Sequence, residues 1–575
     1  MKKSLYLLTA VAVIAANAPA AAMSEQWLTR YAPPLSNASS TPAPVSTDST
    51  ATRPEAQKQQ VVIKNLRGVA LVDKPTMVRK RGASVEGVSG DPEVFPARVT
   101  AVAEAYLGKP LTFGDLDQLT RDLVLAFRAE NRPVVNVVAP EQDVTNGTLQ
   151  ILVVVGRLSA VRIEGARAED VPFFAREATL AVDEPVDEGA VLDTLRYLNR
   201  NPFRAVSALY QPGKRFGETE VVFNVNQQKP WIVYGGVETK GDRGPLGVWR
   251  PFAGFMLHNT LGLDEVFGYQ FTMGEDLESL RSHVVSLNLP LMSRYHLLLT
   301  YGRSDSTSNL PNPLTQKGVS DVAGAYLTAP LRHWGRVSHD LRFGAEYKAS
   351  NNNLDFGGNN VTDTKAVAIH GVVGYSGELI SGWGVTRFDA NASFSPGDLG
   401  GGNNDTAFNA LRAGAKSNYV YARATIDHRY DFSSGWRLVQ TLTGQASDQT
   451  LLPSETLLLG GDGSVRGFTF GKQRADSGIV SNTTIYTPAL SLLQGAGGFN
   501  DQLRFYAFYD AAFGRNQSPT AVDMQKVKLA GVGVGISYDL APHASLDLGY
   551  GWRVEQTANT PKDNGAVHFR LTVRY

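Results

Sequence analysis

The chain has 575 residues and carries 55 basic and 55 acidic side chains, so its formal net charge is zero. That balance argues against a nucleic-acid partner held by bulk charge. Because the chain has no cysteine, it has neither a disulfide framework nor a thiolate metal site.

The first residues are predicted to be a targeting segment. Two lysines precede a mostly apolar run from Leu5 to Ala16, and small residues follow. This order is typical of a secretory signal peptide, which we place at residues 1–22. The apolar run is too short to span about 30 Å of hydrocarbon, and no other stretch is long enough for a transmembrane helix. Residues 23–35 are expected to include a short helix. Residues 36–60, rich in Ser, Thr, Pro and Ala, are expected to be a linker.

Residues 61–156 and 157–228 are predicted to form two small α/β modules with the same β-α-α-β-β order. In the first module, Thr112 and Asp115 have the spacing of a helix capping box. Apolar residues follow at helical spacing: Leu116, Leu119, Leu123 and Phe127. The elements expected in the first module are a strand at 61–63, helices at 96–107 and 114–131, and strands at 133–139 and 149–155. Those expected in the second are a strand at 160–164, helices at 171–181 and 188–199, and strands at 205–210 and 219–225.

Residues 229–575 are predicted to form a transmembrane antiparallel β-barrel. About sixteen segments of alternating apolar and polar residues are bounded by Gly, Asn, Asp, Ser and Pro. Their connections are short near Leu289–Ser293 and long at 303–318, 350–362 and 395–416, and the longest is 448–476. Short turns at one end and long loops at the other are typical of outer-membrane barrels.

The last segment shows the alternation most clearly. Side chains alternate across a strand, so a polar set of His568, Arg570, Thr572 and Arg574 faces one side. A soluble edge strand can show the same pattern, but a terminal aromatic residue after many similar segments favours a barrel strand. Val567 lies on the other, apolar face, together with the residues that we expect to carry the signal for barrel assembly: Phe569, Leu571, Val573 and Tyr575.

The longest connection contains a glycine-rich motif around Arg466. Glycine adopts backbone conformations that other residues resist, so this loop can reverse tightly around Val465-Arg466-Gly467-Phe468. A solvated surface arginine is the ordinary interpretation of Arg466 taken alone. Two strands later, however, Asp510 shares its face with Phe508, while Phe505, Tyr509 and Phe513 lie on the opposite, lipid-suited face. Asp510 is therefore expected to point into the lumen, where it can meet a cation from an inward-folded loop.

These motifs resemble those of a known superfamily. Val465-Arg466-Gly467-Phe468 is similar to the V-R-G-[FY] signature of the sixth extracellular loop of the Omp85 superfamily. Phe508-x-Asp510 resembles its F-x-D-x-G partner motif, with Ala512 in place of the glycine. The segment from His258 to Asp264 resembles a turn early in the barrels of two-partner secretion transporters, the ShlB/FhaC/HecB family. The likeness covers about residues 61–575. Two POTRA domains are usual in these transporters, whereas the barrel-assembly protein and its translocation-assembly relative carry more.

The resemblance implies an outer-membrane transporter of a Gram-negative bacterium, with two POTRA domains in the periplasm. These would capture an unfolded exoprotein, typically large, β-helical and encoded nearby, and the barrel would release it outside without ATP. Other implied partners are outer-membrane lipid and, during biogenesis, the barrel-assembly machinery. In this family an N-terminal helix often plugs the barrel, and the candidate here, Ser24–Tyr31, is short. The client remains open among an adhesin, a haemolysin, a haem scavenger and a contact-dependent toxin.

Other functions have weaker support in the sequence. An outer-membrane insertase on the same fold is the first alternative, and a passive porin or receptor is the second. No two of the nine histidines stand three or four residues apart, so a helical metal pair is not expected. Neither a cofactor nor catalytic residues are predicted, since Gly382-Trp383-Gly384 lacks a central serine nucleophile.

Overall fold

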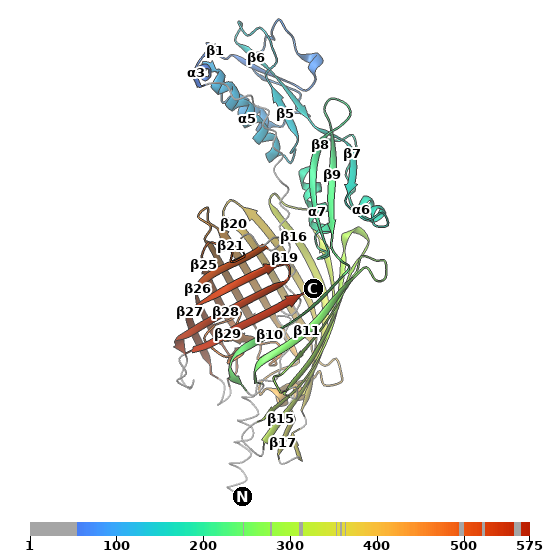
Figure 1. Cartoon of the computed structure of the whole chain (residues 1–575), viewed down its shortest axis with the longest axis vertical. Coiled ribbons are helices and arrows are strands. Elements are labelled where there is room, and N and C mark those ends of the chain that lie inside the picture. The colour runs from blue at the N-terminus through green and yellow to red at the C-terminus, as the bar shows by residue number, and fades with distance from the viewer. Residues whose placement is uncertain are drawn as a thin grey trace. The chain divides into compact units, whose positions relative to one another are not determined.

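The computed structural model describes residues 55–244, 247–276, 279–309, 314–351, 353–356, 359–362, 364–493, 500–519, 524–556 and 565–575. The predicted signal peptide at 1–22, the helix at 23–35 and most of the linker at 36–60 lie outside these residues. The chain divides into two compact units, of which one covers Ser36–Gln228 and the other includes Lys229–Tyr575 (Figure 1).

The first module of the smaller unit has a four-stranded sheet in the order β3-β2-β6-β5. Its first sheet strand is β2 (Gly68–Val72), whose five residues are all buried, and not the expected Val61–Ile63. Val61–Ile63 is β1, which pairs with β4 (Leu111–Thr112) in a separate two-stranded ribbon. The module's other elements are α3 (Glu55–Lys58), η1 (Pro75–Met77), β3 (Gly87–Ser89), α4 (Ala97–Glu104), α5 (Phe113–Ala129), β5 (Val135–Val138) and β6 (Thr148–Val155).

The capping box predicted at the start of α5 is confirmed. The Thr112 side chain accepts a hydrogen bond from the Asp115 N–H at 3.1 Å, and the Asp115 carboxylate accepts one from the Thr112 N–H at 2.9 Å. Two of the four orphan N–H groups of the helix start are satisfied in this way. The expected apolar face is buried in the core of the module: Leu116, Leu119, Leu123 and Phe127.

The second module has the predicted β-α-α-β-β order, with its strands arranged β7-β9-β8. α7 begins after Asp187, whose carboxylate accepts hydrogen bonds from the next free N–H groups, and Val191, Leu195 and Leu198 fill the core. α6 ends at Glu177, earlier than expected. The elements are β7 (Arg157–Glu164), α6 (Val171–Glu177), α7 (Glu188–Leu198), β8 (Arg204–Pro212) and β9 (Glu218–Gln227).

The larger unit is a closed antiparallel barrel with sixteen strand positions, which confirms the predicted fold. Among the described residues, no helix is long and apolar enough to cross a membrane. The wall strands are β10 (Trp231–Gly244), β11 (Gly247–His258), β12 (Val266–Met273), β13 (Leu280–Pro290), β14 (His296–Asn309), β15 (Leu314–Pro330), β16 (Val337–Asn351), β19 (Lys365–Ser381), β20 (Gly384–Pro396), β21 (Asn418–Asp431), β22 (Arg437–Ser447), β25 (Ser477–Tyr486), β26 (Asn500–Arg515), β27 (Lys526–Ala541), β28 (Ala544–Gln556) and β29 (Gly565–Arg574).

Two of the expected long loops are instead extended hairpins. β14 and β15 remain paired from His296↔Thr328 to Asn309↔Thr315. β16 pairs directly with β19, and the chain between them forms β17 (Asn353–Phe356) and β18 (Asn359–Thr362). β17 also pairs with β15, so these strands extend the wall (Figure 1). The short elements outside the wall are η2 (Met292–Arg294), α8 (Asp405–Leu411), β23 (Leu457–Leu459) and β24 (Gln473–Ala475).

β29 closes the barrel by pairing with β10, from Tyr234↔Arg574 to Glu238↔Arg570. The backbones of Tyr575 and Val233 exchange two further hydrogen bonds, at 2.9 and 3.1 Å. The expected alternation holds along β29, because Val567 and Val573 are exposed on the outside whereas His568 and Thr572 are buried on the inside. The barrel therefore has a lipid-suited outer face and a polar inner face up to its last strand.

Candidate functional site in the barrel lumen

The connection at 448–476 runs from β22 to β25 and folds into the lumen. Its two short strands, β23 and β24, pair with each other. Beyond them, Val465 and Phe468 are fully buried, and they belong to one apolar cluster with Val480, Ala512 and Leu529 of the inner wall. We call residues 448–476 the lumenal loop, because its tip packs against inward-facing wall residues.

The tip of the lumenal loop is held by Arg466 and Asp510. The Arg466 Nε lies 2.7 Å from Asp510 Oδ2, and its Nη2 lies 2.8 Å from Oδ1. The Arg466 backbone N–H donates a third hydrogen bond to Asp510 Oδ2 at 3.0 Å. The Asp510 side chain is fully buried and that of Arg466 is 13% exposed. The expected approach of these two side chains is thus confirmed, and the bidentate geometry is the strongest arrangement for such a pair.

Two further wall residues complete the seat of the Arg466 guanidinium. The Arg466 Nη2 also donates to Thr484 Oγ1 at 2.9 Å, and Thr484 lies on the strand beside Asp510. The guanidinium carbon lies 3.6 Å from the centre of the Phe508 ring. A cation over an aromatic face is attracted by the ring quadrupole. The Phe508-x-Asp510 spacing therefore supplies one ring and one carboxylate on the same face of β26.

Glycines let the loop backbone touch the wall backbone. Gly467 has a φ of +98°, and a Cβ placed there would lie 3.1 Å from Gly551. A Cβ on Gly531 would lie only 2.0 Å from the Arg466 carbonyl oxygen. A side chain at Gly531 would clash with the loop backbone, and one at Gly467 would be strained by the positive φ, so both glycines are required by the seated loop.

Polar side chains also bind the backbone of the loop tip. The Gly467 N–H donates to His568 Nε2 at 3.0 Å, and Arg553 Nε donates to the Gly467 carbonyl at 2.8 Å. The Arg553 guanidinium also lies 5.1 Å from the centre of the Phe468 ring. Both side chains point inward from strands β28 and β29. The loop tip is therefore in contact with β25, β26, β27, β28 and β29.

A second set of buried charges holds the lumenal loop nearer its start. Glu455 Oε2 lies 3.1 Å from Lys348 Nζ, which in turn lies 2.6 Å from Glu346 Oε2. The Tyr421 hydroxyl donates to Glu455 Oε2 at 2.7 Å, and His370 Nε2 lies 2.9 Å from Glu346 Oε2. These wall residues lie on β16, β19 and β21, so Glu455 and Arg466 are attached to different parts of the wall.

The structure gathers six predicted residues in one site: Val465, Arg466, Gly467, Phe468, Phe508 and Asp510. The four residues proposed as an assembly signal lie apart from it, on the apolar face of β29 and, for Tyr575, directly after the strand. The sequence analysis did not assign Thr484, Arg553 and His568 to this site, although the alternation of side chains along their strands places all three on the inner face. The alternate glycines at 531, 533 and 535 were a further signal that something packs closely against this wall.

The arrangement is suited to a reversible conformational change. Every contact at the tip is an ion pair, a hydrogen bond, a ring contact or apolar packing, so the loop can leave without breaking a covalent bond. A loop whose tip contacts several wall strands occupies part of the lumen. Displacing the loop would enlarge the passage, and restoring the Arg466–Asp510 pair would reseat it.

Comparisons with known proteins show which family this chain resembles. A family model of the haemolysin secretion/activation protein ShlB/FhaC/HecB matches residues 217–538, and a model of the ShlB-type POTRA domain matches residues 84–156. The heme/hemopexin transporter protein HuxB of Haemophilus influenzae (strain 86-028NP) is 26% identical over 472 residues, which are 79% of this chain and 80% of HuxB. The outer membrane transporter CdiB-2 of Burkholderia pseudomallei (strain 1026b) is 23% identical, over 82% of this chain and 80% of its own length.

Solved structures show the same fold. CdiB from Escherichia coli superposes with a TM-score of 0.70 at 18% identity, covering 93% of this chain and 94% of its own. CdiB from Acinetobacter baumannii superposes with a TM-score of 0.61 at 16% identity, covering 89% of this chain and 90% of its own.

Proposed function

This chain belongs to the haemolysin secretion/activation protein family ShlB/FhaC/HecB, and we propose how its parts carry out two-partner secretion. It is an outer-membrane β-barrel transporter with a periplasmic POTRA region, and its partner is a secreted exoprotein. In our proposal the unfolded exoprotein is captured by the modules at 61–156 and 157–228. It then passes through the barrel as the lumenal loop moves aside, without ATP. This mechanism rests on one observation, the contact between Arg466 of the lumenal loop and Asp510 on the inner face of the barrel.

Capture by the POTRA region is supported by the free edge of β8 in the second module. β8 is an edge strand of its sheet. The Val206 N–H donates to Asn199 Oδ1 at 2.7 Å, and Asn199 Nδ2 donates to the Val206 carbonyl at 2.8 Å. The Asn199 side-chain amide thus makes the two hydrogen bonds to the Val206 backbone that a neighbouring strand would make. Backbone groups of alternate residues in an antiparallel strand point the same way, so those of Ala208 and Tyr210 face the same edge.

Strand addition at this edge would suit many exoprotein sequences. An extended peptide gains backbone hydrogen bonds from an exposed strand whatever its side chains are. Leu209, which is 44% exposed, offers an apolar contact beside the edge. We propose that this edge of β8 is the first docking place for the exoprotein.

The proposed function predicts that the barrel does not suffice for secretion. The two modules have separate apolar cores, one from Ile63 to Val153 and the other from Leu158 to Val225. Deletion of residues 61–156 should therefore leave the second module and the barrel folded, while exoprotein release falls below detection. Release is measured in the culture medium, and barrel folding by the shift in gel mobility on heating. Normal release from this deletion would contradict the proposal.

A single substitution tests the β8 edge more narrowly. Proline is tolerated on an edge strand where its missing N–H would face away from the sheet. Ala208→Pro should keep the module folded but remove one donor from the docking edge. We expect secretion to fall by roughly fivefold to tenfold, the effect of about one hydrogen bond. Ser207→Ala is the matched control, since the Ser207 N–H faces β9 and remains. Equal secretion by the two variants would exclude docking at this edge.

Outer-membrane lipid and the barrel-assembly machinery complete the proposed partners. Large apolar side chains cover the outer face, among them Phe505, Tyr509 and Phe513, each at least 40% exposed. That face is suited to hydrocarbon. The apolar side of β29, with Phe569, Leu571, Val573 and Tyr575, is our proposed signal for assembly.

A further inference from the structure

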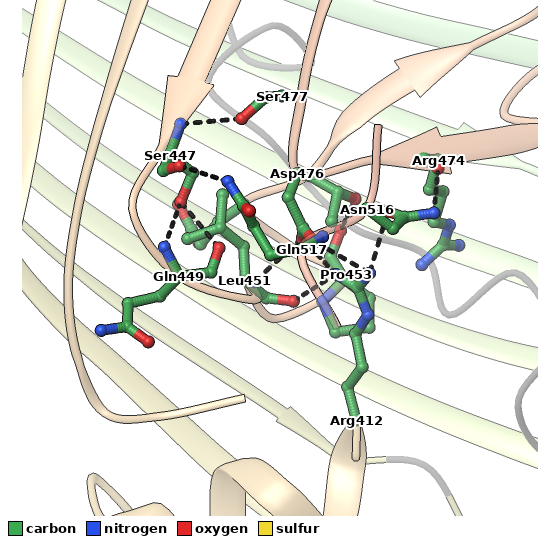
Figure 2. Close-up of polar contacts among 12 residues, drawn as sticks. Arg412, Ser447, Gln449, Leu451, Pro453, Arg474, Asp476, Ser477, Asn516 and Gln517 are labelled. Atoms are coloured by element: carbon green, nitrogen blue, oxygen red, sulfur yellow. Dashed lines mark hydrogen bonds and ion pairs between the residues drawn. The ribbon is translucent and has the colours of Figure 1, made fainter. Parts of the chain in front are cut away.

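Asp476 joins three connections at one end of the barrel. It is the last residue of the lumenal loop, and its carboxylate is fully buried. Arg412, from the connection between β20 and β21, lies with its Nη1 2.6 Å from Asp476 Oδ1 and its Nη2 3.4 Å from Oδ2. The Gln517 N–H, from the connection after β26, donates to Asp476 Oδ2 at 2.9 Å. Figure 2 shows these groups converging on one carboxylate.

The same cluster also holds the start of the lumenal loop. The Leu451 N–H donates to Asp476 Oδ1 at 3.0 Å, and the Leu451 carbonyl accepts from Arg412 Nη1 at 2.6 Å. Arg412 Nη2 donates in addition to Asn516 Oδ1 at 3.1 Å. Both ends of the loop are therefore tied to each other and to two neighbouring connections (Figure 2).

Arg412 is placed by a small helix with its own core. α8 ends at Leu411, directly before Arg412, and its Asn404 cap accepts a hydrogen bond from the Ala407 N–H. Phe408 of this helix is fully buried against Tyr419, and Leu451 and Leu452 of the lumenal loop belong to the same apolar cluster. The guanidinium is thus held in place by packing, and little conformational entropy is lost when it pairs with Asp476.

A second guanidinium group lies near that of Arg412. Burial, together with the nearby Arg412 charge, lowers the pKa of Arg474 to about 10. Two guanidinium groups therefore lie in this region, and Asp476 pairs with that of Arg412. A buried carboxylate with this many donors cannot lose its cation cheaply.

The cluster is separate from the contact at the loop tip. Asp510 and Gln517 lie on β26 and its continuation, seven positions apart, which corresponds to roughly 20 Å along an extended chain. Arg466 contacts the middle of the wall, whereas Asp476 contacts residues beyond the strand ends. The hydrogen bonds of the two contacts have no residue in common.

We propose that Arg412 and Asp476 form a second latch of the lumenal loop, independent of Arg466 and Asp510. They are positioning residues: they hold the base of the loop at the outer mouth of the pore. After loss of the tip contact alone the base still holds the loop in the lumen, and the loop leaves the lumen freely only when both latches are open. The proposal rests on the proposed role of the loop as the movable part of the pore.

The absence of cysteine from the chain allows a direct test. Ser464→Cys places one thiol at the loop tip, where Ser464 is 6% exposed. Its labelling by a membrane-impermeant maleimide added to whole cells reports departure of the loop. No exoprotein is present, so the result does not depend on whether secretion follows the proposed route. In this background we expect Asp476→Asn to accelerate labelling by about tenfold, the effect of losing a charged hydrogen-bonded pair.

Double variants separate a latch from general loosening. Arg412→Gln should accelerate labelling as much as Asp476→Asn, and the two together should add nothing, since partners in one pair are not additive. Asp476→Asn should act by the same factor again when combined with Arg466→Ala, because the latches are independent. Asp448→Asn is the control. Asp448 belongs to the same loop but is exposed, and among the described residues its carboxylate accepts a hydrogen bond only from the Val420 N–H, so labelling should be unchanged.

Three results would overturn the proposal. Unchanged labelling in Asp476→Asn would exclude a latch at this place. An effect that disappears in the Arg466→Ala background would mean one latch rather than two. If Asp476→Asn does not assemble, Arg412→Gln alone gives the labelling rate, and an unchanged rate there would likewise exclude the latch.

Discussion

Arg466→Ala is expected to reduce exoprotein secretion by at least tenfold while the barrel still inserts into the outer membrane. The substitution removes the cation from a fully buried carboxylate, together with two of its three hydrogen bonds. Loss of one partner from a buried pair costs about 3–5 kcal/mol. This cost weakens the attachment of the lumenal loop to the wall, whereas the hydrogen bonds between the wall strands are kept. Secretion is measured as exoprotein in the medium, and insertion by heat-dependent gel mobility.

Companion variants identify the cause of that loss. Asp510→Ala should have the same phenotype as Arg466→Ala. Arg466→Lys should recover only part of the activity, because an ammonium group cannot make the bidentate contact. Arg429→Ala is the matched control, since Arg429 lies on the inner wall, is 45% exposed and pairs with Asp431. If Arg429→Ala is as harmful as Arg466→Ala, the effect reflects lumen charge in general and our account fails.

Removal of Leu571–Tyr575 is expected to prevent formation of the barrel. Four of the five paired positions between β10 and β29 involve residues of this segment, from Leu571 to Arg574, and Tyr575 adds two backbone hydrogen bonds. Without them β10 has an open edge, and unpaired backbone groups cannot be left in hydrocarbon. We expect the truncated protein to be degraded or aggregated in the periplasm, as measured by fractionation.

A point substitution provides the control for the truncation. Tyr575 packs its ring 5.6 Å from that of Trp231, and Lys229 Nζ lies 4.4 Å from its centre. Tyr575→Phe keeps the ring and both backbone hydrogen bonds, so normal insertion is expected. Normal amounts of the truncated protein in the outer membrane would show that closure and the assembly signal lie elsewhere.

The barrel and the tip contact were predictable because both follow from the period of a strand. Parity alone placed Asp510 in the lumen, and the glycines around Arg466 indicated a tight reversal. β2, Gly68–Val72, is a continuous apolar run, as expected for a central strand with both faces covered. Val61–Ile63 is a short apolar run of the same kind, and composition alone did not show which of the two belongs to the main sheet.

The Arg412–Asp476 pair was beyond sequence reasoning for a different reason. Its residues lie 64 positions apart, in connections that have no period. Neither segment has a sequence feature that indicates its partner. The two meet only because the barrel strands that they connect lie close together. The hairpin beyond β16 was mistaken for a loop because its Asn-rich and Gly-rich sequence resembles a turn, although the backbone there continues the pairing of the wall.

The glycines of the inner wall change how the seat of the loop can be damaged. Gly531 and Gly551 contact the loop backbone, and Gly533 and Gly535 lie beneath Phe508 and Tyr506. The wall thus accommodates the loop at positions that have no side chain, and the fit of the loop depends on shape as much as on charge. Most binding sites fail when a group is taken away. This site is expected to be as sensitive to a single added methyl group, because a larger residue in place of one of these wall glycines would push the loop out of its position.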